Sequence, residues 1–329
     1  MPNDETGLTV DIREDDLREL SEEVLDTLLF DHTTRHNIFW ATHDYESLGS
    51  MYDYHSEILP ELITGERGMV IRPRMLKSKA NQADRAKDMA EVFTPSWVCN
   101  AQNNLVDEAW FGRKDVFNVE DTEKHTWHTF PNKIEFPEGK TWKDYVRATR
   151  WEITCGEAPY LVSRYDATTG AFIPLNERIG LLDRKLRIVS ENTDSSGEWL
   201  DMAQEAYMHT YGFEWQGDNL LLAREALLWT FIENYQARFG KMPILKSLKY
   251  IAYIISWNIF QMDGLKGVVP DSCHSQTVVS GGLFEERTER TIPCPGCEKE
   301  DLRHHNGIYC LIRDWPNNKK KIRFIDLIK

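Results

Sequence analysis

The stretch RWEITCGEAPYLVSRYD, residues 150–166, combines the parts from which a nucleotide-binding turn is built. Residues 151–154 are typical of a strand, a small flexible step follows, and the apolar run after it favours the start of a helix. Strand, tight turn and helix in this order form the phosphate-facing turn of many α/β folds. The usual glycine pair is reduced to Gly156 and Ala158. The stretch therefore predicts a cofactor turn with one glycine missing, and Ala158 is compatible with an α- or β-region backbone.

Strand and helix patterns alternate along the chain from residue 150 onward. YGFEW (211–215) is typical of a short strand that ends on an acid, and the long amphipathic helix after it ends at Gly240. WNIFQMDG (257–264) is typical of a further strand, and a hairpin is expected around residues 170–188. Alternating units of this kind favour a parallel sheet covered by helices. The predicted fold class is α/β, with a Rossmann-like core.

Three strand ends carry the residue types that a nucleoside cofactor needs. The turn at 155–158 allows close approach of the backbone, and Glu214 can accept hydrogen bonds from both ribose hydroxyls. Asp263 can accept the exocyclic amine of an adenine ring, while Trp215 suits packing on that ring and packing in the core equally well. Each signal is weak alone, but their order at successive strand ends predicts one cofactor site at the carboxyl edge of the sheet.

Four segments resemble the amino-group (N6-adenine) DNA methyltransferases of restriction-modification systems. AEVFTPSWVCNAQNNLVD (90–107) is similar to their Phe-Thr-Pro motif at a helix start, and EITCGEAPYL (152–161) is similar to their cofactor loop. YGFEWQGDNLLLAREALL (211–228) resembles the strand, acid and helix that bind the ribose, and NIFQMDGL (258–265) resembles the segment that holds the adenine edge. The resemblance spans roughly residues 88–267.

This resemblance implies a Rossmann-like methyltransferase core that binds S-adenosylmethionine. The cofactor-binding residues that it implies are Phe93, Thr94, Pro95, Glu152, Thr154, Cys155, Gly156, Ala158, Tyr160, Glu214, Trp215 and Asp263.

The family's catalytic Asn-Pro-Pro-Tyr tetrapeptide is due some tens of residues after Asp263, and the chain contains no Pro-Pro pair. In the family, that element polarises the target amine and stacks on the flipped base. No catalytic residue is therefore assigned. The resemblance implies the cofactor-binding subunit of an adenine-specific DNA methyltransferase, with a second polypeptide supplying the catalytic motif and target recognition. A non-catalytic or degenerate homologue is the alternative, and an enzyme acting on RNA or a small amine is a further one.

A cluster of metal-ligand residue types lies near the C-terminus, in CPGCEKEDLRHHNGIYC (294–310). Cys-Pro-x-Cys is a common zinc-binding turn whose second ligand pair comes from downstream. The pattern predicts a closed structural zinc site formed by Cys294, Cys297, His305 and Cys310, in which His304 or Cys273 can serve instead. Free thiols in a cytoplasmic protein are the competing interpretation.

Composition sets the remaining expectations. The formal net charge is −14, so the chain alone is not expected to grip DNA, although basic residues gather at 72–87 and 317–324. No apolar run reaches the ~18 residues of a membrane span and no secretory signal is evident, so a cytoplasmic location is expected. We expect a mostly helical N-terminal region (1–90), a methyltransferase-like domain (91–270) and a zinc-binding tail (271–329). Helices are expected over 11–30 and from Pro95 onward.

Overall fold

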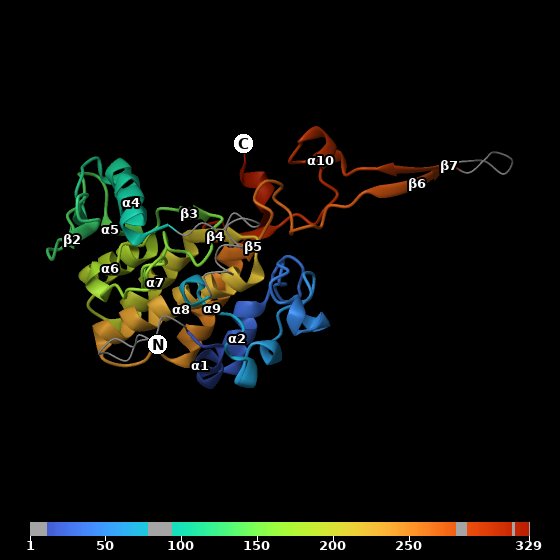
Figure 1. Ribbon diagram of the computed structural model, residues 1–329. Coiled ribbons are helices and arrows are strands. Elements are labelled where there is room, and N and C mark those ends of the chain that lie inside the picture. Colours follow the sequence, from blue (N-terminus) through green and yellow to red (C-terminus); the bar gives the residue numbers. More distant parts are fainter. Residues whose placement is uncertain (1–11, 78–93, 281–287, 318–319, 329) are drawn as a thin grey trace.

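The computed structural model describes residues 12–77, 94–280, 288–317 and 320–328 (Figure 1). The single helix expected over 11–30 is two helices, α1 (Glu14–Leu20) and α2 (Glu22–Leu29). They separate at Ser21, whose backbone is extended, with φ −178° and ψ 130°. Beyond α2, the described N-terminal residues form isolated bridges between Phe30 and Asn37 and between Phe39 and Glu57. They also form short 3-10 turns: η1 (Glu46–Leu48), η2 (Ser50–Tyr52), η3 (Pro60–Leu62), η4 (Gly65–Arg67) and η5 (Arg74–Leu76).

A three-stranded parallel sheet lies at the centre of the molecule, so the expectation of an α/β fold with a parallel sheet is confirmed. Its strands are β3 (Arg150–Ile153), β4 (Thr210–Glu214) and β5 (Ile259–Gln261), in the order β3-β4-β5. Their register pairs Glu152 with Gly212 and Gly212 with Ile259. Because neighbouring strands are parallel, their carboxyl ends meet at one edge.

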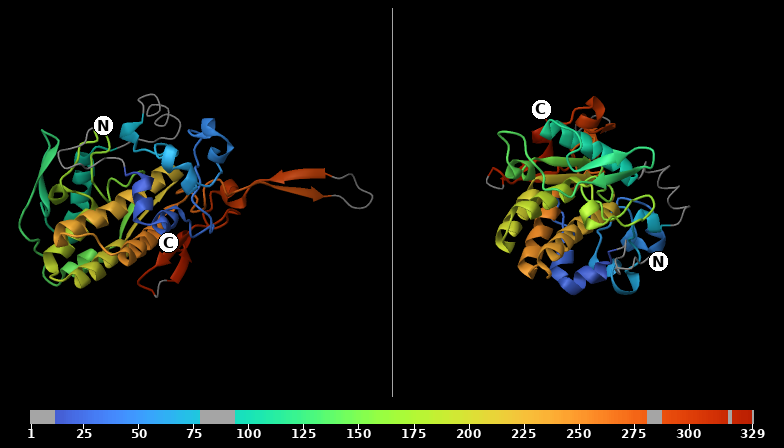
Figure 2. Two further views of the ribbon diagram at one scale, coloured as in Figure 1. Left: turned by 90° about the horizontal axis from the view of Figure 1, so that it is seen from below. Right: turned by 90° about the vertical axis from the view of Figure 1, so that its left-hand side faces the viewer.

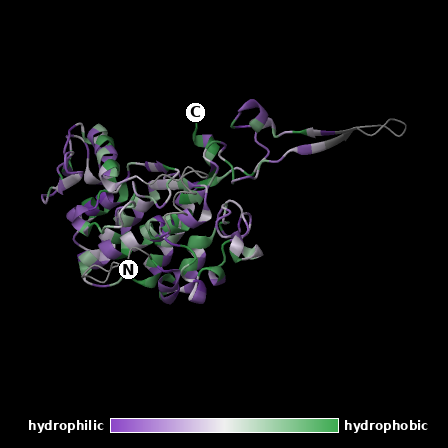
Figure 3. Ribbon diagram, viewed as in Figure 1, coloured by the Kyte–Doolittle hydropathy of each residue, from purple (hydrophilic) through white to green (hydrophobic). Residues whose placement is uncertain are grey.

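Helices connect the strands and cover one face of the sheet (Figures 1 and 2). The connection from β3 to β4 contains α6 (Leu181–Asn192) and α7 (Ser196–Met208), and that from β4 to β5 contains α8 (Gly217–Phe239) and α9 (Leu245–Asn258). Hydrophobic stretches concentrate in this helical layer, and hydrophilic ones lie at the periphery (Figure 3). The apolar helix faces and the sheet share one core, which also includes residues of α1 and α2.

The opposite face of the sheet is covered by the C-terminal hairpin. This hairpin consists of β8 (Leu311–Asp314) and β9 (Lys320–Arg323) and is followed by η7 (Phe324–Leu327). Phe213 and Phe260 of the sheet pack there in a second apolar cluster, against Ile312 and Phe324. The two apolar clusters on opposite faces hold the strands in place, which positions their carboxyl ends.

The peripheral elements project from this body (Figure 1). β6 (Gln276–Ser280) and β7 (Thr288–Ile292) form a long antiparallel arm, followed by α10 (Pro295–Lys299). At the other end lie α4 (Ser96–Phe111), the antiparallel pair β1 (Asn118–Asp121) and β2 (Thr126–Thr129), α5 (Trp142–Val146), and η6 (Leu175–Glu177). Of the helices in the described ranges, none combines the length and the apolar character needed to cross a bilayer.

The hairpin expected over 170–188 is wrong, and so is the helix expected directly after the cofactor turn. The chain after the turn forms further turns with one isolated bridge, Tyr165 to Phe172, and the next α-helix is α6. Leu182, Leu186 and Val189 recur at helical spacing in α6 and are fully buried. This period of three to four residues favours a helix over the period of two that a hairpin requires.

Helix α4 buries its polar side rather than its apolar one. Asn103 and Asp107 are 1% exposed, whereas Leu105 is 65% exposed. The amide of Asn103 donates to two backbone carbonyls of the segment that follows β3, and Asp107 forms an ion pair with the buried Arg184. These hydrogen bonds satisfy the polar face and attach α4 to the body.

Candidate cofactor edge and candidate metal centre

The turn after β3 has a left-handed backbone at three alternate residues. Thr154, Gly156 and Ala158 have φ values of +50°, +53° and +61°. Glycine adopts this region readily, but threonine and alanine are strained in it. The expectation of an α- or β-region backbone at Ala158 is therefore wrong. The amide of Cys155 donates to the carbonyl of Phe213 at 2.9 Å, and this bond attaches the turn to β4.

Glu152 stabilises the turn from within. Its carboxylate accepts the backbone amides of Tyr160 and Leu161 at 3.3 and 3.1 Å. The side chain is buried, and this burial raises the pKa of Glu152 well above its ordinary value against the lowering effect of the two amides. Glu152 therefore braces the loop that follows β3, as a residue that shapes the candidate site.

Glu214 closes β4 and faces the turn after β3. Its Oε2 atom accepts the Gly156 amide at 2.8 Å, and its Oε1 atom accepts the Gln216 amide at 3.3 Å. The residue is 8% exposed, and burial raises the pKa of its carboxyl while these amides lower it. The parallel pairing of β3 and β4 therefore brings Glu214 and Gly156 into direct contact.

Asp263 and Trp215 lie at the same edge but have their own partners. The Asp263 carboxylate accepts the Leu265 amide at 3.0 Å and lies 3.0 Å from Lys266 Nζ, within its own turn. Trp215 Nε1 donates to the hydroxyl of Tyr54 at 2.9 Å. Asp263, which is expected to hold the adenine edge, thus makes its contacts within its own turn. The Trp215 indole contacts Tyr54 of the N-terminal region.

The start of α4 lies beside the cofactor turn. Pro95 is the residue before α4, as expected, and no side chain caps this helix start. The side chain of Tyr160 lies close enough to Thr94 and Cys99 to interact with them, and burial raises the pKa of this tyrosine. Thr94, Pro95 and the turn are therefore brought together, while Phe93 lies outside the described residues.

An N-terminal segment crosses the carboxyl edge, a feature that the sequence pattern did not reveal. The Gln261 side chain at the end of β5 donates to the carbonyls of Phe39 and Trp215, at 2.9 and 2.8 Å. The Gly217 amide donates to the Trp40 carbonyl at 3.0 Å. A Cβ atom on Gly217 would lie 2.1 Å from the Phe39 carbonyl oxygen, so this crossing requires glycine at the start of α8.

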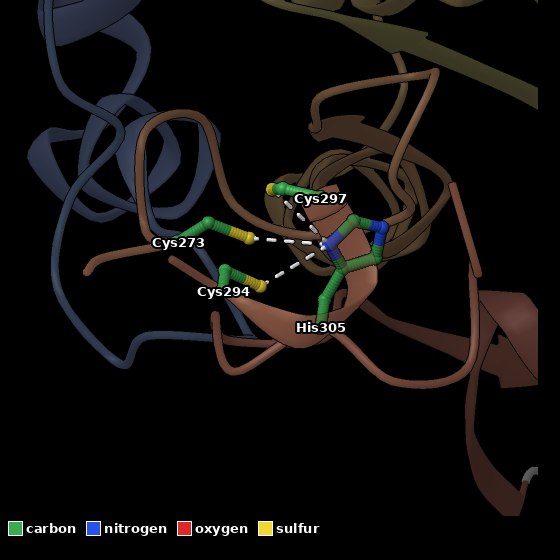
Figure 4. Close-up of side chains that lie close together, drawn as sticks. All are labelled: Cys273, Cys294, Cys297 and His305. Carbon is green, nitrogen blue, oxygen red and sulfur yellow. Dashed lines mark hydrogen bonds between the residues drawn. The ribbon is translucent and has the colours of Figure 1, made fainter. Parts of the chain in front are cut away.

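Four side chains near the base of the β6–β7 arm converge on one point (Figure 4). The Sγ atoms of Cys273, Cys294 and Cys297 lie 3.5, 3.6 and 3.6 Å from the Nδ1 atom of His305, and all four atoms lie within 4.8 Å of one another. This Cys3His cluster can hold a metal ion. Cys273 precedes β6 and Cys294 follows β7, so an ion there would close the base of the arm.

Backbone groups surround the sulfur of Cys294 in the cluster. Burial alone raises the pKa of Cys294. Hydrogen bonds to its sulfur outweigh this effect and lower the pKa to about 6; they come from the Asn306 amide at 3.2 Å, the amides of residues 296 and 297, and the His305 ring. A Cβ atom on Gly296 would lie 2.6 Å from the His305 amide nitrogen, so glycine there permits the close approach of the His305 segment. These groups therefore favour the charged sulfur at Cys294, whereas burial and the neighbouring thiols raise the pKa of Cys273 to about 12.

Cys310 lies outside this cluster, and Cys273 takes its place. The Cys310 thiol is fully buried, packs among the aromatic residues under the C-terminal hairpin, and donates to the Gln261 carbonyl at 3.3 Å. His304 is also outside, with its exposed ring hydrogen-bonded to the Asp301 carboxylate. Of the ligands expected from the sequence, Cys294, Cys297 and His305 come together. Cys310 is excluded because the path of the chain into β8 turns its thiol toward the sheet.

Comparison with known proteins produced no match to a family model, to a curated protein or to a solved structure.

Proposed function

We propose that this chain binds S-adenosylmethionine at the carboxyl edge of its parallel sheet, as the cofactor-binding subunit of an adenine-specific DNA methyltransferase. The observation that carries the proposal is the contact between Glu214 and the left-handed turn after the neighbouring strand. An acid at the end of one strand beside a tight turn at the end of the next is the arrangement that nucleoside-binding α/β proteins use.

Each strand end supports a separate part of the proposal. Glycine at position 156 would let the cofactor approach the backbone of the turn closely, where the Gly156 amide now donates to Glu214. Glu214 would exchange the Gly156 amide for the ribose hydroxyls, and Asp263 would accept the adenine amine. When bound, the cofactor would supply a methyl group on a sulfonium, which is a strong electrophile.

A second polypeptide completes the proposed enzyme. The chain has a net charge of −14 and no Pro-Pro pair, so both the DNA contacts and the groups that polarise the target amine would come from the partner. This division is tested by mixing the chain with the product of the neighbouring reading frame and measuring methyl transfer to DNA. Full activity of this chain alone would contradict the division.

Cofactor binding is tested by calorimetric titration with S-adenosylmethionine. We expect micromolar affinity, about −8 kcal/mol, and its loss in Glu214→Ala. Asp201→Ala, at an exposed position of α7, is the matched control and is expected to bind as the unmodified chain does. Binding without methyl transfer in the mixture would favour a non-catalytic cofactor-binding protein. The absence of binding heat would refute the cofactor proposal.

We also propose that the Cys3His cluster holds a structural Zn²⁺. Bond lengths of about 2.3 Å to sulfur and about 2.05 Å to nitrogen, at a tetrahedral angle, place S and N about 3.6 Å apart. The three observed distances of 3.5 to 3.6 Å fit this value. Four protein ligands leave no open position for a substrate, which favours a structural site over a catalytic one. Elemental analysis of the purified chain is expected to give one zinc per chain.

A further inference from the structure

The acids of the proposed cofactor edge are covered in this structure. Glu214 is 8% exposed and Asp263 is 3% exposed, and Asp218, in the first turn of α8, is fully buried. A ligand of nucleoside size can reach these side chains only if part of the covering chain moves away. Two segments of the N-terminal region contact this edge, and the structure holds them in different ways.

The first segment, residues 38–40, is part of the core. The side chains of Ile38 and Trp40 are fully buried in the main apolar cluster. The Phe39 amide donates to Gln261 Oε1 at 3.1 Å, which adds to the bond that the Gln261 side chain donates to the Phe39 carbonyl. Moving this segment would expose core side chains to water, so it is expected to stay in place.

The second segment, residues 74–77, is attached to the edge by polar contacts. The Arg74 amide donates to Glu157 Oε1 at 2.7 Å, and Lys77 Nζ lies 3.0 Å from Asp218 Oδ2. None of the four residues is fully buried, and η5 is a single 3-10 turn. A segment with little buried apolar surface opens at a lower free energy than the core does.

These two contacts are made to the structures that flank Glu214, which are the turn after β3 and the start of α8. Glu157 follows Gly156, whose amide is bonded to Glu214. Three residues of chain span at most about 10 Å, so residues 74–77 join the turn directly to Asp218. The segment therefore lies across the approach that a ligand of Glu214 would take.

Both acids keep a donor when this segment moves away. Glu157 Oε2 accepts the Tyr165 hydroxyl at 2.6 Å, and Asp218 Oδ2 accepts the Tyr45 hydroxyl at 2.8 Å. The contacts of residues 74–77 can thus break without leaving either carboxylate without a hydrogen bond, which limits the free energy that opening costs.

We propose that residues 74–77 are a latch over the carboxyl edge of the sheet. A ligand reaches Glu214 only after the latch leaves Glu157 and Asp218, while residues 38–40 stay in place. A ligand that binds only the open state shifts the equilibrium towards it. Control of S-adenosylmethionine binding by the latch rests on the proposed function, whereas the latch itself does not.

The first test compares Arg74→Pro with Arg74→Ala. Both lack the arginine side chain, but only Arg74→Pro lacks the amide that donates to Glu157. Proline is tolerated at the first position of a helical turn, and the ψ of 141° at Pro73 suits a residue that precedes proline. Hydrogen–deuterium exchange read by mass spectrometry is expected to be at least about tenfold faster in Arg74→Pro, over residues 75–77 and 153–161.

Opening of the latch is local, so exchange in α6 and the midpoint of urea unfolding are expected to be the same in the two variants. A contact that only stabilises the fold would instead lower the midpoint and speed exchange throughout the chain. That result, or equal exchange over residues 153–161 in both variants, would overturn the proposal.

Lys77→Met tests the other end of the latch. It keeps an apolar side chain of similar length but removes the charge that faces Asp218. Lys124→Met is the matched control, since Lys124 pairs with Asp121 on the surface and its side chain is 76% exposed. The same local rise in exchange is expected in Lys77→Met and none in the control. No rise in Lys77→Met, or a rise of equal size in the control, would contradict the latch.

Titration with S-adenosylmethionine separates the latch from the proposed function. Lys77→Met is expected to bind the cofactor more tightly than the unmodified chain, because a larger fraction of its molecules is open. Weaker binding would place Lys77 among the ligand contacts and overturn its role in the latch. If neither chain binds the cofactor, the proposed function fails, and the exchange measurements alone decide whether the latch exists.

Discussion

Replacing Asp107 by alanine tests how helix α4, whose polar face is buried, is attached to the rest of the protein. The Asp107 side chain is 2% exposed, and its Oδ2 atom lies 2.6 Å from Nη1 of Arg184, whose side chain is 1% exposed. Its Oδ1 atom accepts the Tyr145 hydroxyl at 2.7 Å. The alanine variant removes the buried counter-charge of the guanidinium and leaves the phenol without its acceptor.

The magnitude follows from this burial. Removing one partner of a buried ion pair lowers the free energy of unfolding by about 3–5 kcal/mol, because the remaining charge stays desolvated. At about 2 °C per kcal/mol, this corresponds to a fall in Tm of about 6–10 °C. Asp107→Asn keeps an acceptor for Tyr145 and removes only the charge, so its effect is expected to be intermediate.

Urea unfolding followed by circular dichroism measures these differences. Asp121→Ala is the control, since its ion pair with Lys124 is solvent-exposed and contributes little. In the double variant with Arg184→Met, much of the loss is expected to be recovered, because the guanidinium that contacts Asp107 most closely no longer remains buried without its counter-charge. A loss in Asp107→Ala no larger than that in the control would refute the reasoning that this buried pair anchors α4.

Three further outcomes follow from other parts of the structure. Cys273→Ser is expected to lose bound zinc and Cys310→Ser to keep it, as measured by elemental analysis; the reverse result would contradict the ligand assignment. Burial and the charge of Arg224 lower the pKa of His32 from 6.5 to about 3, so native His32 stays neutral while the unfolded chain takes up a proton. Stability should therefore fall as the pH drops from about 6.5 towards 3, and His32→Phe, measured by urea unfolding at pH 7.5 and 5, should show a weaker fall; an equal fall would count against this. Arg224 is fully buried and donates to four backbone carbonyls, in and after α2, in α9 and in β5. Arg224→Met should therefore lower the free energy of unfolding by at least about 3 kcal/mol. A change near zero would show that Arg224 does not hold these elements together.

Part of the candidate metal site could be predicted from sequence and part could not. Cys294 and Cys297 are on one short turn, so their spacing alone identifies them as a ligand pair. Cys273 is separated from them by the whole β6–β7 arm, and only the antiparallel pairing of that arm returns the chain to it. Cys310 is nearer in sequence but enters the apolar cluster beneath β8. Sequence distance is a poor guide once a hairpin intervenes.

The amino-acid sequence by itself determined the strands of the sheet, the long helix that ends at Gly240, and the acid that closes β4. These features depend on local periodicity, caps and turn residues, which act over a few residues. The tertiary structure decided which face of α4 is buried, because the partners of Asn103 and Asp107 come from distant segments. It also decided that residues 39 and 40 cross the carboxyl edge. Such contacts depend on how remote polar groups satisfy one another in the interior, and no local pattern encodes that choice.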